Sequence, residues 1–161
     1  MRGFTEMATK CNENLYLVMA KTSRGLRNNN PGNIRLGTVT YQGEVVPSKD
    51  KAFRQFRTMA YGYRAMFVLL HTYQRKHGLM TIEAMITRYA PAVENHTRAY
   101  IDAVAEWSGV PATCRVTSTN AEVMVPIVAA MSRVENGVPA DIDEVEMGWK
   151  LFINDYRAHN I

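Results

Sequence analysis

The chain of 161 residues has only two cysteines, and none of its apolar runs approaches the length of a membrane span. Cys11 and Cys114 lie far apart in the sequence, so we expect reduced thiols and not the disulfide framework of a small secreted domain. A membrane-spanning helix needs about 20 consecutive apolar residues. The apolar stretch LYLVMA near the N-terminus is much shorter, and no small-residue cleavage site follows it. We therefore expect neither stable membrane insertion nor a signal peptide.

Histidine is scarce as well, with four residues in the chain. His71 and His77 are six residues apart, which is not the spacing of zinc ligands on one helix. The sequence therefore predicts neither a metal site nor a cofactor. The formal net charge of +4 is small and fits an acidic cell-wall polymer as well as nucleic acid. Because charge is the only indication of nucleic acid, we expect none as a partner.

The composition, with 47% hydrophobic and 21% charged residues, is that of an ordinary globular domain. Helical periodicity predicts an N-terminal helix or extension over residues 1–23, followed by one domain over residues 24–161. Between Ile34 and Phe56, β-branched residues and glycine turns predict a β-hairpin or a small sheet. Caps and apolar stripes then predict helices over about 58–77, 81–89, 95–109, 120–136 and from 141 onward, with Trp107 and Trp149 on buried faces. The predicted fold class is mainly α with a small β-element.

The stretch RNNNPGN, residues 27–33, carries more amides than one turn needs. A tight turn accounts for Asn30, Pro31 and Gly32 without any ligand, because these residues favour turn backbone. The remaining amides suit a second interpretation, since an amide both donates to and accepts from sugar hydroxyls and N-acetyl groups. Both interpretations stay open, and Asn30 and Asn33 are candidate substrate contacts.

A second candidate region is RYAPAVENHTRAYI, residues 88–101. Pro91 can end one helix, and Asn95 or Thr97 can cap the next, which explains the segment structurally. The same junction offers Tyr89, Glu94 and Asn95 as the lining of a glycan groove. Both readings are compatible with the sequence.

Glu135 stands in the last turn of a predicted helix, before Asn136 and the terminating Gly137. A carboxylate there interacts unfavourably with the negative end of the helix dipole, which costs up to about 1 kcal/mol of stability. It is either a solvated surface residue or a general acid, because burial and the negative helix end both favour the protonated carboxyl. Glu44, in YQGEVV, is either a turn residue or a second polar group of the same site. Tyr41 is a candidate stacking contact.

The order of these motifs resembles a family of phage-encoded proteins. That family has an RNNNPGN opening, an aromatic-Gln-Gly turn, a Phe-x-x-Phe strand, an APxxENxTxxY junction and a C-terminal ENG. Here the matching stretches are RNNNPGN, YQG, FRQF, APAVENHTRAY and ENG, within residues 24–148. Members are described as virion structural proteins or as lysozyme-like peptidoglycan hydrolases. The resemblance therefore implies a lysozyme-like helical domain.

A more distant similarity to bacterial cell-wall glucosaminidases and other lysozyme-superfamily enzymes has the same order of NNPGNIR, AFRQF, YGYRAMFVLL and RYAP. Those enzymes carry their catalytic glutamate upstream of the asparagine segment. The only upstream glutamates in this chain are Glu6 and Glu13, neither in a recognisable motif. Our hypothesis is a permuted arrangement in which Glu135 supplies the acid, with Glu94 as second choice and Glu13 as third.

The function that the resemblance implies is cleavage of peptidoglycan glycan strands during lysis or genome entry, by a muramidase or a lytic transglycosylase. The catalytic candidates are Glu135 and Glu94, and the substrate contacts would be Asn30, Asn33, Tyr41, Glu44, Tyr89 and Asn95. The alternative is a non-catalytic virion protein that keeps the lysozyme-like shape to bind glycan or other capsid proteins. In either case we expect the protein in the phage particle or the host cytoplasm, acting at the cell wall.

Overall fold

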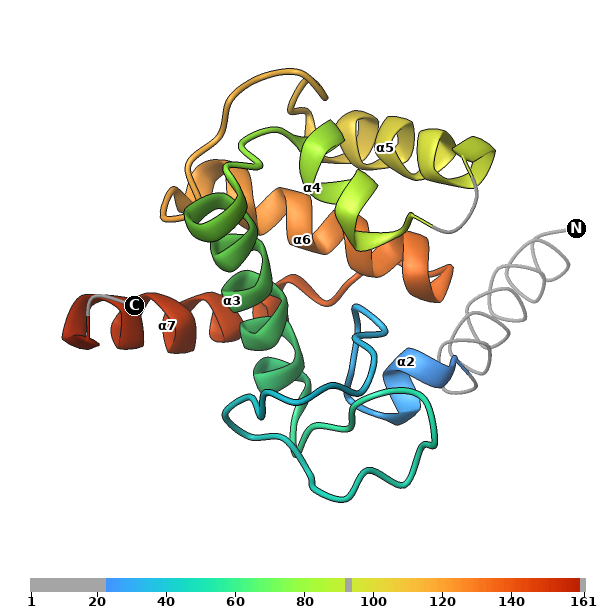
Figure 1. The fold of residues 1–161 in the computed structure, drawn as a ribbon, viewed down its shortest axis with the longest axis vertical. Helices are drawn as coiled ribbons and strands as arrows, with labels where there is room; N and C mark the ends of the chain where they lie inside the picture. Colours follow the sequence, from blue (N-terminus) through green and yellow to red (C-terminus); the bar gives the residue numbers. More distant parts are fainter. Residues whose placement is uncertain (1–22, 92–93, 160–161) are drawn as a thin grey trace, which may run out of the picture.

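The computed structural model describes residues 23–91 and 94–159, and these residues form helices joined by loops. In Figure 1, α3 runs through the middle of the molecule, with α4, α5 and α6 toward the top of the view, α2 and a long loop toward the bottom, and α7 extending to the left. The N-terminal helix predicted over residues 1–23 lies outside the described residues, apart from Ser23. The helices of the described part are α2 (Arg24–Arg27), α3 (Met59–His77), α4 (Ile82–Tyr89), α5 (Glu94–Ser108), α6 (Ala121–Asn136) and α7 (Ile142–His159).

The helices from α3 onward begin and end close to their predicted positions, because capping residues fix them. The Thr58 side chain accepts a hydrogen bond from the backbone N–H of Tyr61 at the start of α3. Thr81 begins α4 in the same way. Gly78 and Gly137 end α3 and α6 with φ of 64° and 73°, a left-handed conformation that glycine adopts without steric cost. The mainly α prediction is confirmed.

The core lies around α3, which packs most extensively against α7. The two helices approach closely at Gly148, where a side chain would come within 2.5 Å of the Tyr63 Cβ atom and 2.9 Å of the Ala60 carbonyl oxygen. Fully buried side chains from α3 itself, from α4, α6 and α7, and from the loop before α3 fill the core. The largest of them are Tyr63, Phe56, Phe67, Phe152, Met66, Leu70, Ile82, Met85, Ile86, Met124, Ile127 and Met131.

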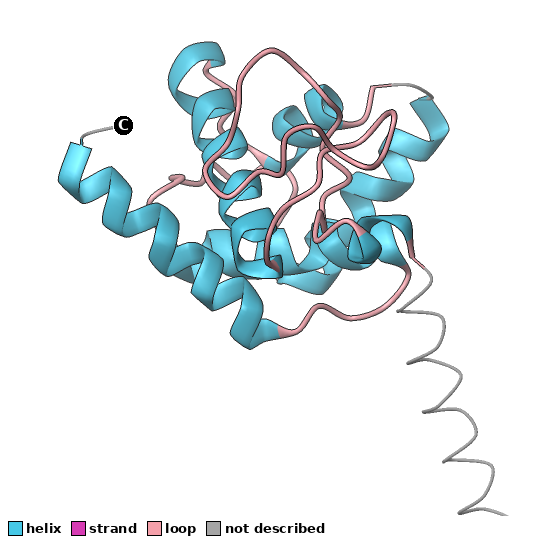
Figure 2. Ribbon diagram, turned by 90° about the horizontal axis from the view of Figure 1, so that it is seen from below, coloured by secondary structure: helices cyan, strands magenta, loops and turns pink. Residues whose placement is uncertain are grey.

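The predicted β-hairpin or sheet over residues 34–56 is wrong. Figure 2 shows loops and helices but no strand in the described chain, and two isolated bridges, Arg35 with Phe53 and Glu44 with Phe56, are the remaining β-like pairings there. Side chains take the place of a ladder: the Asp50 carboxylate accepts from the backbone N–H groups of Ala52 and Phe53, at 2.8 and 3.0 Å. Such side-chain bonds compete with strand pairing for the same backbone groups.

Two further expectations need correction. Helix α5 begins at Glu94, so Asn95 and Thr97 lie within its first turn and do not cap it. Trp107 was predicted to face the core, but 42% of it is exposed and the Arg133 guanidinium lies 4.0 Å above its ring.

None of the helices in residues 23–91 and 94–159 combines the length and the hydropathy that a bilayer span requires.

Candidate active site

The asparagine-rich stretch forms a compact loop after α2, and its amides are bonded to different parts of the fold. Asn28 donates to the Asp50 carboxylate at 3.0 Å. Asn29, with φ of 50°, donates to the backbone oxygen of Phe56 at 3.1 Å. These bonds attach the loop to the segment that leads into α3. The turn interpretation therefore holds for part of the stretch, but each amide has its own partner.

Asn30 is the centre of this loop and is completely buried. Its Nδ2 donates to the backbone oxygens of Ile34 and Arg54, both at 2.9 Å, and its Oδ1 accepts from the Ile34 N–H at 2.9 Å. Asn30 was a candidate substrate contact, but it has no exposed surface to offer a ligand. Its amide holds the loop together.

The turn Pro31–Gly32 is held against the end of α6. The Asn136 side chain donates to the Pro31 carbonyl at 2.8 Å and accepts from the Ser23 hydroxyl at 2.6 Å. The Tyr89 hydroxyl donates to the Gly32 carbonyl from the opposite side. Helix α3 contributes Gly62, where a Cβ atom would collide with the Asn29 carbonyl oxygen, so only glycine permits this approach.

Glu135 lies in the last turn of α6 and meets the asparagine loop through Asn33. The Asn33 Nδ2 donates to Glu135 Oε2 at 2.9 Å, and the Tyr100 hydroxyl donates to Oε1 at 3.2 Å. Burial raises the pKa of Glu135 above the ordinary glutamate value, although the two donors act in the opposite direction because they stabilise the carboxylate. Asn33 has φ of 48°, a left-handed conformation that asparagine tolerates and that aims its amide at α6.

Glu135 opens onto a cavity of about 440 Å³ between the asparagine loop and α3, α4 and α6. This space, the Glu135 cavity, is lined by apolar and aromatic side chains together with polar and charged groups, a combination that can bind a small ligand. Burial also raises the pKa of Tyr89 well above that of free tyrosine, and the nearby Glu135 carboxylate adds to the effect, so Tyr89 stays a neutral donor. The described lining residues are Asn33, Ile34, Arg35, Phe53, Leu69, Tyr73, Tyr89, Ala90, Pro91 and Glu135.

Two other candidates, Tyr41 and Glu44, do not line this cavity. Glu44 forms a buried ion pair with Arg54 at 2.7 Å, with side-chain exposures of 4% and 6%. The Arg54 guanidinium also lies 4.8 Å above the Tyr41 ring, and Tyr41 packs against Phe56. Both candidates therefore stabilise the loop that carries Asn33. The side chains of Glu94 and Asn95 lie outside the described residues.

Sequence reasoning missed four contributors. Tyr100 was not among the candidates, and Asn136 was expected only as part of a helix end. Tyr100 bonds Glu135, and Asn136 holds the Pro31 turn. Arg35 and Phe53 pair with each other in an isolated β-bridge, and both line the Glu135 cavity. The motif ENG contained the signal for Asn136, because the C-cap in this motif is Gly137 and leaves the asparagine amide free for another partner. Among residues 23–91 and 94–159, no three His, Cys, Asp or Glu side chains gather as a metal site requires.

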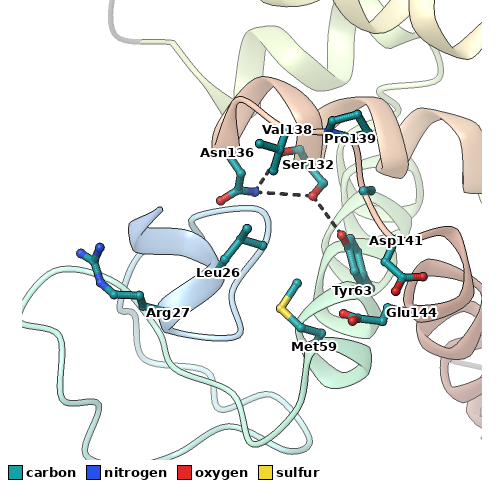
Figure 3. A pocket seen from close by; sticks show the side chains of 11 residues that line it. Leu26, Arg27, Met59, Tyr63, Ser132, Asn136, Val138, Pro139, Asp141 and Glu144 are labelled. Carbon is teal, nitrogen blue, oxygen red and sulfur yellow. Dashed lines mark hydrogen bonds between the residues drawn. The ribbon is translucent and has the colours of Figure 1, made fainter. Parts of the chain in front are cut away.

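A second cavity, of about 450 Å³, lies on another side of Asn136 (Figure 3). Its polar floor is a chain of hydrogen bonds from Asn136 through Ser132 to Tyr63, with 3.0 Å between the Ser132 and Tyr63 hydroxyl oxygens. Burial raises the pKa of Tyr63 to about 12, so this hydroxyl is neutral. Asp141 and Glu144 stand at the edge, and burial raises the pKa of Glu144 with a smaller contribution from Asp141. Because Tyr63 and Ser132 are already hydrogen-bonded to each other, we interpret these polar groups as structural and not as a ligand site.

No protein-family model matches the chain. It is similar to Protein P5 of Pseudoalteromonas phage PM2, with 40% identity over 134 residues. The matched region covers 81% of this chain and 82% of Protein P5. The chain therefore belongs to the family of Protein P5, a protein of phage PM2.

Proposed function

We propose that this homologue of a phage protein cleaves the glycan strand of peptidoglycan and that Glu135 is the acid. The observation that carries the proposal is the position of Glu135, a partly buried carboxyl group of raised pKa that opens onto an aromatic-walled cavity. Enzymes that protonate a glycosidic oxygen near neutral pH need such a carboxyl group. A helical domain with its acid at a helix end, facing an asparagine loop, also fits a lysozyme-like fold.

In this mechanism, protonated Glu135 donates its proton to the oxygen of the bond between two aminosugars as that bond breaks. Asn33 and Tyr100 hold the carboxyl group in position, and they stabilise the carboxylate that remains after proton transfer. The rings of Phe53, Tyr73 and Tyr89 offer apolar faces to the sugars. These residues account for acid catalysis and for sugar binding.

The second half of the reaction depends on whether another carboxylate is available. Among the described residues that line the cavity, Glu135 is the one acidic side chain. Glu44 is paired with Arg54, and Asp50 with Arg24, whose guanidinium holds the Asp50 pKa well below its usual range. We therefore favour lytic transglycosylase chemistry: the substrate's 6-hydroxyl attacks the anomeric carbon, a 1,6-anhydro ring forms, and the hydroxyl proton returns to Glu135.

A non-catalytic role within the virion is the second candidate, and one observation favours it. Both carboxyl oxygens of Glu135 are bonded within the chain, so this residue also joins α6 to the asparagine loop and to α5. In that case the protein would bind glycan or other virion proteins without cleaving either.

The test is incubation of the purified full-length protein with peptidoglycan sacculi, followed by turbidity and by chromatography of released muropeptides. The proposal predicts clearing and products with 1,6-anhydro ends. Products with reducing ends would show that the protein hydrolyses the glycan and is not a lytic transglycosylase. Intact sacculi at every pH would favour the non-catalytic role.

The pH dependence of cleavage follows from the upward shift of the Glu135 pKa. We expect kcat/KM to be highest where Glu135 is protonated and to fall as the pH rises through its raised pKa. The falling limb should therefore lie above the pH at which an ordinary glutamate ionises. Initial rates of muropeptide release over a pH series measure this limb, and a rate that rises throughout the same range contradicts an acid role.

Replacing Tyr100 with phenylalanine removes one of the two donors to Glu135 and leaves the ring. Because this donor stabilises the carboxylate, the pKa of Glu135 should rise further and the falling limb should move to higher pH. A variant that merely loosened the fold would lose rate at every pH without moving the limb. Tyr156→Phe on α7, which does not line the cavity, is the matched control.

A further inference from the structure

We propose that Arg35 is a specificity-determining residue that binds a carboxylate of the substrate, so that the glycan accepted by the Glu135 cavity is a carboxylate-bearing one and not a neutral aminosugar polymer. This inference rests on the proposed function, because it concerns the same cavity and assumes a glycan ligand. It assigns a separate task to a separate residue. Arg35 contacts no reacting atom in the mechanism above.

The first support is the placement of Arg35. It lies next to the buried Ile34 in the loop, is itself exposed, and lines the Glu135 cavity together with Phe53. Its guanidinium lies 5.0 Å from the centre of the Phe53 ring. Stacking of this kind restrains the long side chain, so less entropy is lost when the guanidinium binds a ligand.

The second support is that the hydrogen-bond donors of the Arg35 guanidinium are available to a ligand. Arg24 also lies over the Phe53 ring, at 4.5 Å, but it forms a bidentate pair with Asp50 at 2.7 and 2.8 Å. Within residues 23–91 and 94–159, no hydrogen bond or ion pair engages the Arg35 side chain. A guanidinium presents its donors as a planar fork that fits the two oxygens of a carboxylate.

The third support is the charge of the cavity. Its described lining contains one acidic side chain, Glu135, and one basic side chain, Arg35. The proposed mechanism needs Glu135 neutral, and the lining then carries a net positive charge. Arg88 does not line the cavity, but its guanidinium lies 5.3 Å from the centre of the ring of Tyr73, a lining residue, and adds a second positive charge nearby. An anionic ligand group is favoured at such a site over a neutral one.

Peptidoglycan offers this carboxylate from two sources. The peptide stems carry carboxylates, and the lactyl ether of the muramic sugar exposes one when the stem has been removed. Oligomers of N-acetylglucosamine have the same aminosugar backbone without any carboxylate. These three ligands therefore separate recognition of the sugar from recognition of the charge and identify the source of the charge.

The experiment measures binding with the full-length Glu135→Gln chain, so that no ligand is consumed. Soluble glycan strands with intact stems, amidase-treated strands that retain the lactyl carboxylate, and N-acetylglucosamine oligomers are titrated in turn. Arg35→Ala is then added in the same background. The matched control is Arg57→Ala, because Arg57 also lies over an aromatic ring, at 5.5 Å from the centre of Tyr61, but lines neither cavity.

We expect at least one carboxylated ligand to bind about tenfold more tightly than the neutral oligomers, which is the contribution of one charge-assisted pair. Arg35→Ala should abolish that preference, Arg35→Lys should restore part of it, and Arg57→Ala should leave it unchanged. Rising salt should weaken the preference as well. Equal affinity for neutral and carboxylated ligands, or an unchanged preference in Arg35→Ala, overturns the inference. Cleavage by the unaltered chain is a separate readout, so carboxylate binding through Arg35 without muropeptide release would contradict the proposed function alone.

Discussion

Replacing Glu135 with glutamine is expected to lower the rate of muropeptide release by a factor of about 10² to 10⁴, the usual contribution of a general acid. Glutamine has nearly the same shape and can still bond Asn33 and Tyr100, but its amide has no acidic proton to transfer to the glycosidic oxygen. Release of muropeptides from sacculi under initial-rate conditions measures the loss.

The fold should survive this substitution. Because burial raises the pKa of Glu135, ionisation of this group costs folding free energy, and that cost appears as the pH rises through the raised pKa. Glu135→Gln removes the cost, so the variant should be at least as resistant to urea at neutral pH as the unaltered chain. Glu122→Gln, on the exposed first turn of the same helix, is the activity control. Loss of activity in Glu94→Gln with retention in Glu135→Gln would transfer the acid role to Glu94.

Replacing Asn30 with alanine is expected to lower the free energy of unfolding by about 2 to 6 kcal/mol. The change leaves the Arg54 carbonyl and the Ile34 N–H buried without their partner, at about 1 to 3 kcal/mol for each group. The Ile34 carbonyl loses one of its two donors but still accepts from the Arg54 N–H at 2.9 Å. Urea unfolding followed by circular dichroism measures the change. A loss of this size is a large part of the 5 to 15 kcal/mol that holds a typical domain together.

Asn28→Ala is the control for this prediction. Asn28 donates one bond, to an Asp50 carboxylate that remains paired with Arg24, so its removal should cost less than about 1 kcal/mol. Equal losses in the two variants would show that the loop depends on its amides collectively. A small loss in Asn30→Ala would mean that water replaces the missing amide.

Helices could be predicted from the sequence because the information for them is local. Thr58, Thr81 and Gly137 mark helix ends through bonds and backbone angles within a few residues. The β-prediction failed because residues 34–56 have alternating and branched residues, as a strand does, while distant side chains use their backbone groups. The carbonyls of Arg35 and Val39 accept from the Arg54 guanidinium, a bond that no local pattern specifies.

The candidate site was accessible to sequence reasoning only in part. Glu135 stood out because a carboxylate in the last turn of a helix is locally unfavourable, and Asn33 because a turn does not need so many amides. That these two residues bond each other depends on packing across 102 residues of chain. Tyr41 and Glu44 stabilise the loop itself, because both contact the Arg54 guanidinium. A pattern of residue types cannot distinguish a polar group that binds a ligand from one that supports a neighbour.

The attachment of Ser23 and Pro31 to Asn136 also bears on when the protein can act. The amide loop is translated early and the carboxyl group late, so a growing polypeptide has no assembled cavity until α6 has left the ribosome and docked. Incomplete translation products that stop before α6 contain the loop without the acid. If Glu135 acts as proposed, wall cleavage is restricted to finished, folded molecules, and premature fragments are harmless to the cell in which they are made.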